Sequence, residues 1–497
     1  MSGAVSEPVQ RVIAPDVSVI AEPSLRSRAL RGSAWIVAGT LARQGLKFVS
    51  SLILTRLLFP EAFGLAATAG LLIIAVEMCS DFGIRPALVQ HPAGGTSRYL
   101  DTAWTLMFVR GFGLAGALAM LAWPFAAFFG QPEIFWLALM IAVTPILRGA
   151  ASPALFLWLR NLDQWRLNLL ETSTDAIRIV ATILGALLWR NVWGLAAGGL
   201  VGEVVRTALS YTLGPRRPCW YWDRTAAREL VRFGRFIFIS SVLGFFALRL
   251  DAFFVAKFLG MQRAGVYCIA AAIAAPIEVV GIQVMGSVLF PALSRRQKDP
   301  SLLSQHVSDV LRVVSLVILP AGFLLAAAAP FLVGLLYDVR YEQAGVAARW
   351  LLVAACLGFL AHGLNAPLLA TGRPYWGTGA TGVRLLTFCS LAPVLGTRFG
   401  IEGYAQAVAL SAAAFTIALM IGASLHGHVR PLNVWGDAFR FLIFACALGV
   451  TSHLDLLGTS GSVRGVSGLL LGIALLALLW ITSWKRVRAV LRRDGEW

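Results

Sequence analysis

The chain has 497 residues, of which 58% are hydrophobic and only 13% are charged. Soluble domains hold about 45–50% apolar residues, so this composition excludes an ordinary soluble protein and indicates one that crosses a membrane repeatedly. The formal net charge of +17 does not indicate a nucleic-acid-binding protein, because the Lys and Arg residues are spread between apolar segments.

The N-terminal segment is polar, and a chain of apolar segments follows it. Residues 1–31 contain no apolar core of the kind that signal peptides have, so we expect a disordered cytoplasmic tail there. A membrane-spanning helix needs about 20 mostly apolar residues. The sequence therefore predicts an all-α polytopic membrane protein with about fourteen transmembrane helices, at 33–55, 62–84, 102–128, 133–157, 166–189, 192–213, 234–256, 264–289, 307–336, 343–363, 376–396, 401–425, 436–453 and 466–484.

An internal repeat divides this chain of helices into two halves. Residues 32–90 align without a gap on 233–291. In this alignment Arg56 falls on Lys257, Gly64 on Gly265 and Glu77 on Glu278. Duplicated halves are common in secondary transporters, whose substrate site lies between the two copies. The repeat therefore indicates a transporter.

The repeat also predicts the domain organisation. We expect a first six-helix lobe at 32–213, a cytoplasmic connector at 214–233 and a second six-helix lobe at 234–425. Residues 426–497 then contribute two further helices and a basic cytoplasmic tail. The segments on the side of the N-terminus are richer in Lys and Arg than the opposite loops, so we expect both termini in the cytoplasm.

The first predicted helix carries two cations near mid-membrane. Thr40, Arg43, Lys47, Ser51 and Thr55 are three or four residues apart and share one helical face. An ionised side chain at this depth is costly against lipid, so it must face a wet cavity or a partner. Two interpretations remain open: the face lines an anion site, or acidic side chains neutralise each cation structurally.

Further charged residues lie inside other predicted helices. The cations are Arg110, Arg148, Arg178, Arg206, Arg249 and Arg384, and the acids are Glu77, Asp175, Glu203, Asp251 and Glu278. The spacing predicts structural pairs between Asp175 and Arg178 and between Glu203 and Arg206. The remaining excess of cations favours an anionic substrate, since the guanidinium fork suits phosphate oxygens.

From these residues we select the candidate site. Its substrate-binding cations are Arg43, Lys47, Arg110, Arg249 and Arg384. Glu77, Glu278 and Asp175 are candidates for binding a coupling ion or for balancing charge. Both hypotheses for these acids, ion coupling and charge balance, remain open.

No motif indicates a cofactor, a metal site or an enzyme. The six Cys residues show no metal-ligand spacing, and no phosphate-binding loop of ATPases is present. Two Gly-x-Gly-x-x-Gly matches, at 111–116 and 377–382, lie inside predicted membrane helices, where small residues serve helix packing. The loops are too short for the active site of a membrane glycosyltransferase, which remains the enzyme alternative.

Three stretches resemble a known family. Residues 32–39 (GSAWIVAG), 54–64 (LTRLLFPEAFG) and 81–90 (DFGIRPALVQ) are similar to the polysaccharide transport proteins, the Wzx-type flippases of the multidrug/oligosaccharidyl-lipid/polysaccharide (MOP) exporter superfamily. The resemblance implies a two-lobed exporter in the bacterial inner membrane. It would flip undecaprenyl-diphosphate-linked oligosaccharide by alternating access for exopolysaccharide, capsule or O-antigen synthesis.

The resemblance also sets the partners and the alternatives. We expect contacts with membrane lipids and with the lipid-linked oligosaccharide, and a polysaccharide polymerase and chain-length or export proteins are candidate partners; nucleic acid is not expected. The alternatives are a lipid II flippase of the same superfamily and a drug/cation antiporter. The antiporter would need a cavity with more acids than cations.

Overall fold

The computed structural model describes residues 25–80, 83–84, 87–88, 91, 93–161, 163–214, 217–284, 319 and 321–426. These residues form helices and connecting turns and contain no strand. Nine helical segments among them are long and apolar enough to cross a membrane, and a shorter apolar helix spans Ala321–Leu336. The chain is therefore a multi-pass membrane protein, as predicted.

The first half begins with two long helices and continues with several helices of unequal length. They are α1 (Leu25–Leu57), α2 (Pro60–Met78), α4 (Ser97–Phe129), α5 (Pro132–Ile141), α6 (Thr144–Ala150), α7 (Ala154–Arg160), α8 (Gln164–Trp189) and α9 (Val192–Thr212). The second half contains α10 (Arg224–Leu259), α11 (Met261–Val284), the short turn η2 (Val339–Tyr341), α14 (Gln343–Ala370), α15 (Tyr375–Phe399) and α16 (Ile401–Leu425).

Three predicted boundaries differ from the structure. The span predicted at 133–157 is broken between α5 and α6 and again after α6, where Pro145 and Pro153 each lack the backbone N–H that would continue the helix. Helix α1 begins at Leu25, inside the predicted tail. Helix α10 begins at Arg224, inside the predicted connector.

The early start of α10 has a local cause in Asp223. Its carboxylate caps the helix by accepting from the N–H groups of Thr225 and Ala226, at 2.9 Å each. Arg98 of α4 contacts the same carboxylate at 2.6 Å. The backbone N–H of Ala226 and the Arg98 guanidinium stabilise the charged form and hold the pKa of Asp223 below its usual range.

The spans predicted at 436–453 and 466–484 lie outside the described residues.

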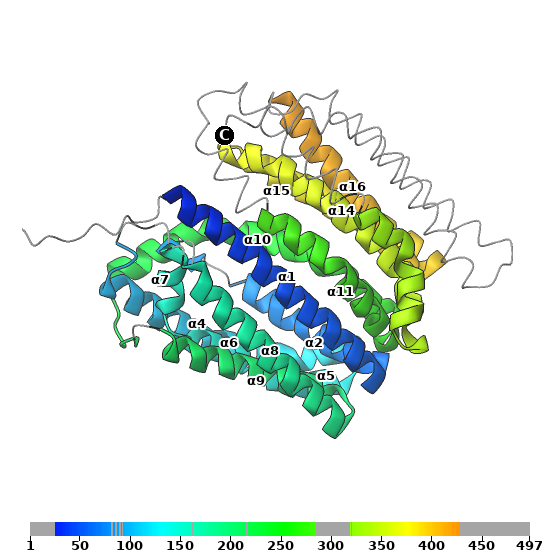
Figure 1. Cartoon of the computed structure of the whole chain (residues 1–497), viewed down its shortest axis with the longest axis horizontal. Helices are drawn as coiled ribbons and strands as arrows, with labels where there is room; N and C mark the ends of the chain where they lie inside the picture. Colours follow the sequence, from blue (N-terminus) through cyan, green and yellow to red (C-terminus); the bar gives the residue numbers. More distant parts are fainter. Residues whose placement is uncertain are drawn as a thin grey trace, which may run out of the picture.

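The two lobes meet mainly along α1, α2, α10 and α11, and α4 also contacts α10. Figure 1 shows α1, α2, α10 and α11 between the remaining helices of the first lobe and the group α14, α15 and α16. At one end of this boundary the first turns of α2 and α11 cross. A Cβ atom added to Gly64 would lie 1.9 Å from the Met261 carbonyl oxygen, and one added to Gly265 would lie 1.7 Å from the Pro60 carbonyl oxygen.

This contact, which we call the glycine crossing, is reciprocal. Gly64 and Gly265 are equivalent in the repeat, and so are Pro60 and Met261. Each glycine touches the backbone at the start of the other helix, which is the pattern that a pseudo-two-fold axis between the lobes produces. The alignment of the two glycines is thereby confirmed in three dimensions.

Side chains reinforce the glycine crossing on both sides. Tyr341 donates from its hydroxyl to the Leu58 carbonyl at 2.9 Å, and Arg340 reaches the carbonyls at the end of α1 at 3.4 Å. On the other side, the Lys257 ammonium donates to the Phe128 carbonyl and lies 4.1 Å from the centre of the Phe128 ring. In this structure the lobes are therefore fastened together at that end.

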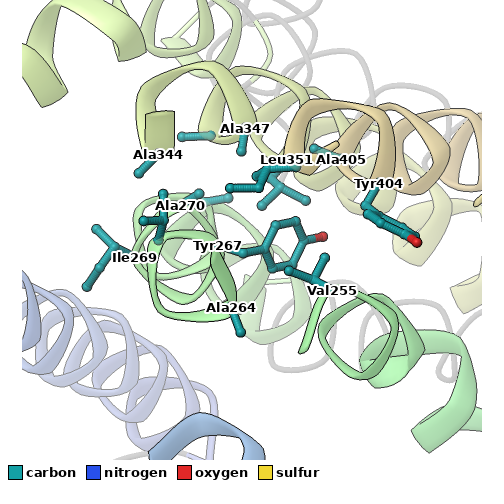
Figure 2. Packing of buried hydrophobic residues seen from close by; sticks show 14 of the residues in the cluster. Val255, Ala264, Tyr267, Ile269, Ala270, Ala344, Ala347, Leu351, Tyr404 and Ala405 are labelled. Carbon is teal, nitrogen blue, oxygen red and sulfur yellow. The ribbon is translucent and has the colours of Figure 1, made fainter. Parts of the chain in front are cut away.

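The largest hydrophobic core spans this boundary and continues into the second lobe. Figure 2 shows its centre, where Tyr267 of α11 is surrounded by side chains of α10, α14 and α16. Tyr267 is 2% exposed and donates from its hydroxyl to Asp251 at 2.6 Å. Alanines such as Ala344 and Ala405 let the helices approach closely around this ring.

We predict that Gly64→Ala destabilises the protein. The new methyl group overlaps a backbone carbonyl that no rotamer change can move, so the helices must separate at a cost of about 1–3 kcal/mol. Thermal unfolding of the detergent-purified protein measures the loss as a lower melting temperature. Gly265→Ala should act alike.

Gly70→Ala is the matched control for this prediction. It lies on the same helix α2, and a Cβ atom there meets no atom within 4 Å. Since alanine favours a helix over glycine by about 1 kcal/mol, this variant should be neutral or slightly more stable. Equal melting temperatures for Gly64→Ala and Gly70→Ala would contradict the close crossing.

Candidate functional site

A polar cavity of about 620 Å³ lies within the first lobe. Helices α1, α2, α4, α6, α8 and α9 all contribute to its walls. Its ionisable lining side chains are Arg43, Lys47, Glu77, Arg110, Arg148, Glu171, Asp175, Arg178, Glu203 and Arg206. Six of these are cations and four are acids, so the lining has an excess of two positive charges.

Arg148 connects three helices across the cavity wall. Its Nη1 donates to both carboxylate oxygens of Glu77, at 2.9 and 2.8 Å, and its Nη2 donates to Glu203 Oε1 at 2.7 Å. Arg148 lies on α6, Glu77 on α2 and Glu203 on α9. One guanidinium thus compensates two carboxylates, which would otherwise repel each other in a medium of low dielectric constant.

Two further ion pairs neutralise the remaining acids of the lining. Arg178 pairs with Asp175 on α8, as the spacing predicted. Arg206 pairs with Glu171 at 3.1 Å instead of with Glu203. The predicted pair between Glu203 and Arg206 is therefore wrong, because the rotation of α9 turns Glu203 toward Arg148 and Arg206 toward α8.

Arg43 and Lys47 differ from these paired cations. Arg43 donates only weakly to neutral oxygens, to Asn168 Oδ1 and Thr40 Oγ1 at 3.4 Å each. Lys47 is exposed in the cavity wall. Within the part of the chain that the structure describes, neither residue forms an ion pair with an acid. These two residues therefore give one face of α1 two cations that no acid of the described residues neutralises.

Arg110 lies beside this pair and is oriented by α2. Its guanidinium donates to the Ser80 hydroxyl at 2.8 and 3.1 Å and to the Glu77 carbonyl oxygen at 3.1 Å. The end of α2 thereby positions Arg110 in the cavity wall. The cavity brings together Arg43, Lys47, Arg110, Glu77 and Asp175 from the predicted set.

The other predicted site residues belong to the second lobe and do not line this cavity. Arg249 is exposed on α10. Arg384 of α15 lies 5.8 Å from the ring centre of Phe415, a cation–π contact. Glu278 of α11 is partly buried. Its repeat equivalent Glu77, in the first lobe, pairs with Arg148.

The sequence analysis missed Glu171 as part of the site. A signal was present, because Asn168, Glu171, Asp175 and Arg178 follow one another by three or four residues and make one polar face of α8. That face turns toward α1, where Asn168 contacts Arg43.

Solved structures with the same fold are membrane transporters. The lipid II flippase MurJ, in an inward closed conformation, superposes with a TM-score of 0.68 at 13% identity, covering 92% of this chain and all of MurJ. An inward-facing multidrug resistance MATE family transporter of the MOP superfamily gives a TM-score of 0.59 at 17% identity, covering 78% of this chain and 98% of that one. The fold is therefore that of the MOP superfamily transporters.

The family follows from a sequence match. The profile of the polysaccharide biosynthesis protein family matches residues 53–345, more than half of the chain. The chain therefore belongs to the polysaccharide biosynthesis protein family, as the three sequence stretches indicated.

Three proteins similar to this chain have names that concern polysaccharides. The lipopolysaccharide biosynthesis protein WzxC of Escherichia coli is 25% identical over 70% of this chain and 71% of its own length. The succinoglycan biosynthesis transport protein ExoT of Rhizobium meliloti is 27% identical over 61% of each chain. The teichuronic acid biosynthesis protein TuaB of Bacillus subtilis is 20% identical over 95% of this chain and 99% of its own.

We predict that Arg148→Ala destabilises the first lobe. It leaves the carboxylates of Glu77 and Glu203 without their shared cation. Breaking a buried pair costs about 3–5 kcal/mol, and we expect about 2 kcal/mol here because the Arg148 side chain is 37% exposed. Thermal unfolding in detergent measures the loss.

Neutralising the two carboxylates that Arg148→Ala leaves without a cation should restore the stability. The triple variant Arg148→Ala, Glu77→Gln, Glu203→Gln should regain most of the lost melting temperature, since no uncompensated carboxylate remains. If the triple variant were as unstable as Arg148→Ala, the loss would come from packing and not from charge.

Proposed function

We propose that this protein is an inner-membrane flippase that translocates undecaprenyl-diphosphate-linked oligosaccharide for exopolysaccharide, capsule or O-antigen synthesis. The observation that carries the proposal is the polar cavity, in which Arg43 and Lys47 have no acidic partner within the described residues. Membership of the polysaccharide biosynthesis protein family supports the substrate class.

The chemistry of the cavity suits a diphosphate. A dianion crossing the membrane core needs fixed positive charge, because water no longer screens it there. The Arg43 guanidinium can form two parallel hydrogen bonds to phosphate oxygens, and the Lys47 ammonium adds a flexible point charge. The sugars would remain in water-filled space while the prenyl chain stays in lipid.

Alternating access would move the substrate across the membrane. In the proposed topology both termini are cytoplasmic, so the glycine crossing lies at the external end of the lobes. With that end fastened, the substrate would enter from the cytoplasm. Parting of the lobes there would then release it outside, driven by an ion gradient or by the membrane potential.

The composition of the cavity argues against a drug/cation antiporter. All four of its acids are engaged by arginines, through the ion pairs of Arg148, Arg178 and Arg206. A cationic drug would therefore meet two excess positive charges instead of a carboxylate. A lipid II flippase differs from our proposal only in the glycan, and complementation of strains that lack one or the other separates the two.

We predict that Arg43→Gln together with Lys47→Gln lowers the flipping rate at least about tenfold, which corresponds to about 1.4 kcal/mol of lost stabilisation of the crossing diphosphate. Flipping of a fluorescent prenyl-diphosphate oligosaccharide in reconstituted vesicles measures the rate. Arg43→Lys with Lys47→Arg keeps both charges and should retain most of the activity.

Both variants must be as stable as the original protein for this comparison to hold. We expect this because neither side chain forms an ion pair within the described structure. Equal flipping by the Gln variant would remove these residues from the site. Export of cationic drugs by the original protein, without flipping of any glycan lipid, would favour the antiporter.

A further inference from the structure

A second cavity, of about 720 Å³, lies in the second lobe and has no part in the cationic site. It opens where α10 and α15 end and where α11, α14 and α16 begin, at the same end of the molecule as the glycine crossing. Its volume is within the range of about 300–1,000 Å³ that small-molecule sites have. We call it the aromatic pocket.

The charge of the aromatic pocket differs from that of the first cavity. Its ionised side chains are one cation, Arg263, and one acid, Glu402, so the lining is neutral. Glu402 is held in place, because its Oε1 accepts from Trp350 Nε1 at 3.1 Å and from Gln406 Nε2 at 3.2 Å. Gln343 adds a side-chain amide. These planar groups can donate to and accept from hydroxyl groups.

Aromatic rings form the apolar part of the pocket. Phe258 at the end of α10 and Phe399 at the end of α15 are 63% and 48% exposed. Tyr404 of α16, which belongs to the core cluster, lies against Gly396, and Figure 2 shows its hydroxyl pointing away from the other labelled side chains. Exposed rings beside fixed hydrogen-bonding groups suit a ligand that has both C–H faces and hydroxyl groups, as a hexose does.

The lining of the aromatic pocket differs from the equivalent part of the first half at two positions of the repeat. Phe258 and Arg263 occupy the positions that Leu57 and Ala62 have in the first half, and both of those residues pack against the hydrophobic core. At these two positions the second lobe therefore presents a ring and a guanidinium to the pocket, whereas the first lobe packs a leucine and an alanine against its core.

We propose that the aromatic pocket binds hexose units of the glycan part of the substrate, separately from the cavity that binds the diphosphate. The proposal rests on the proposed function, since it takes the substrate to be a lipid-linked glycan. The two lobes would then bind different parts of the substrate according to their charge. The cationic cavity of the first lobe binds the diphosphate, and the neutral pocket of the second lobe binds the sugars.

The test uses the full-length protein and a glycan without its lipid. The probe is the oligosaccharide released by mild acid from the lipid-linked intermediates of the cells that carry this chain. Isothermal titration measures its binding to the detergent-purified protein. We expect Phe258→Ala with Phe399→Ala to weaken binding at least fivefold, and Phe258→Trp with Phe399→Trp, which keeps aromatic faces, to retain it.

A control variant separates the pocket from general effects. Phe112→Ala with Trp136→Ala removes exposed rings outside both cavities and should leave binding unchanged. Equal affinity of the pocket variant and the original protein, or no binding of the free glycan by either, would overturn the proposal.

A phospholipid is the competing occupant of the pocket. Native mass spectrometry would overturn the sugar assignment if the Phe258 and Phe399 variant lost a bound phospholipid while it kept its affinity for glycan. Failure of the two proposals is distinguishable. If the protein binds the glycan through the pocket but does not flip the lipid-linked glycan, only the proposed function is contradicted. If the protein flips the lipid-linked glycan but the pocket variant binds the free glycan unchanged, only this inference is contradicted.

Discussion

Charge compensation in a medium without water governs the first lobe. An ionised side chain among membrane helices needs a partner or a hydrated cavity. Arg148 meets this requirement for two acids at once and fixes the mutual positions of α2, α6 and α9. With Glu171 and Asp175 also paired, each acid of the lining already has an arginine partner, and Arg43 and Lys47 remain available for the proposed anionic substrate.

The two lobes share a plan but differ in chemistry. The glycine crossing requires both halves to have the same backbone at α2 and α11, and it keeps Gly64 and Gly265 equivalent. Away from that contact the halves diverge. Lys47 of the first lobe has Leu248 as its counterpart, and Arg263 of the second lobe has Ala62. One lobe therefore presents net positive charge and the other a neutral aromatic pocket.

Much of the fold could be predicted from the sequence because its signals are local. Apolar length indicated the helices, and the spacing of Arg43 and Lys47 indicated their common face. The ion pairs of Arg148 and Arg206 could not be predicted, since they depend on how α9 is rotated against its neighbours. Pro145 and Pro153 were visible signals for the broken fourth span. The aromatic pocket draws on five helix ends, and no local pattern joins Phe258 to Glu402.

The glycine crossing has a consequence for the turnover rate. The carbonyl groups of Pro60 and Met261 that meet the glycines lie in the first turns of α2 and α11, where the α-helical pattern gives each carbonyl an N–H partner in its own helix. Parting the backbones of the two helices at these glycines therefore exposes no unsatisfied carbonyl group and loses dispersion energy. In the proposed alternating-access cycle, the side-chain contacts of Arg340, Tyr341 and Lys257 therefore add to the activation barrier for opening that end, and their strength can be tuned without altering the glycine crossing.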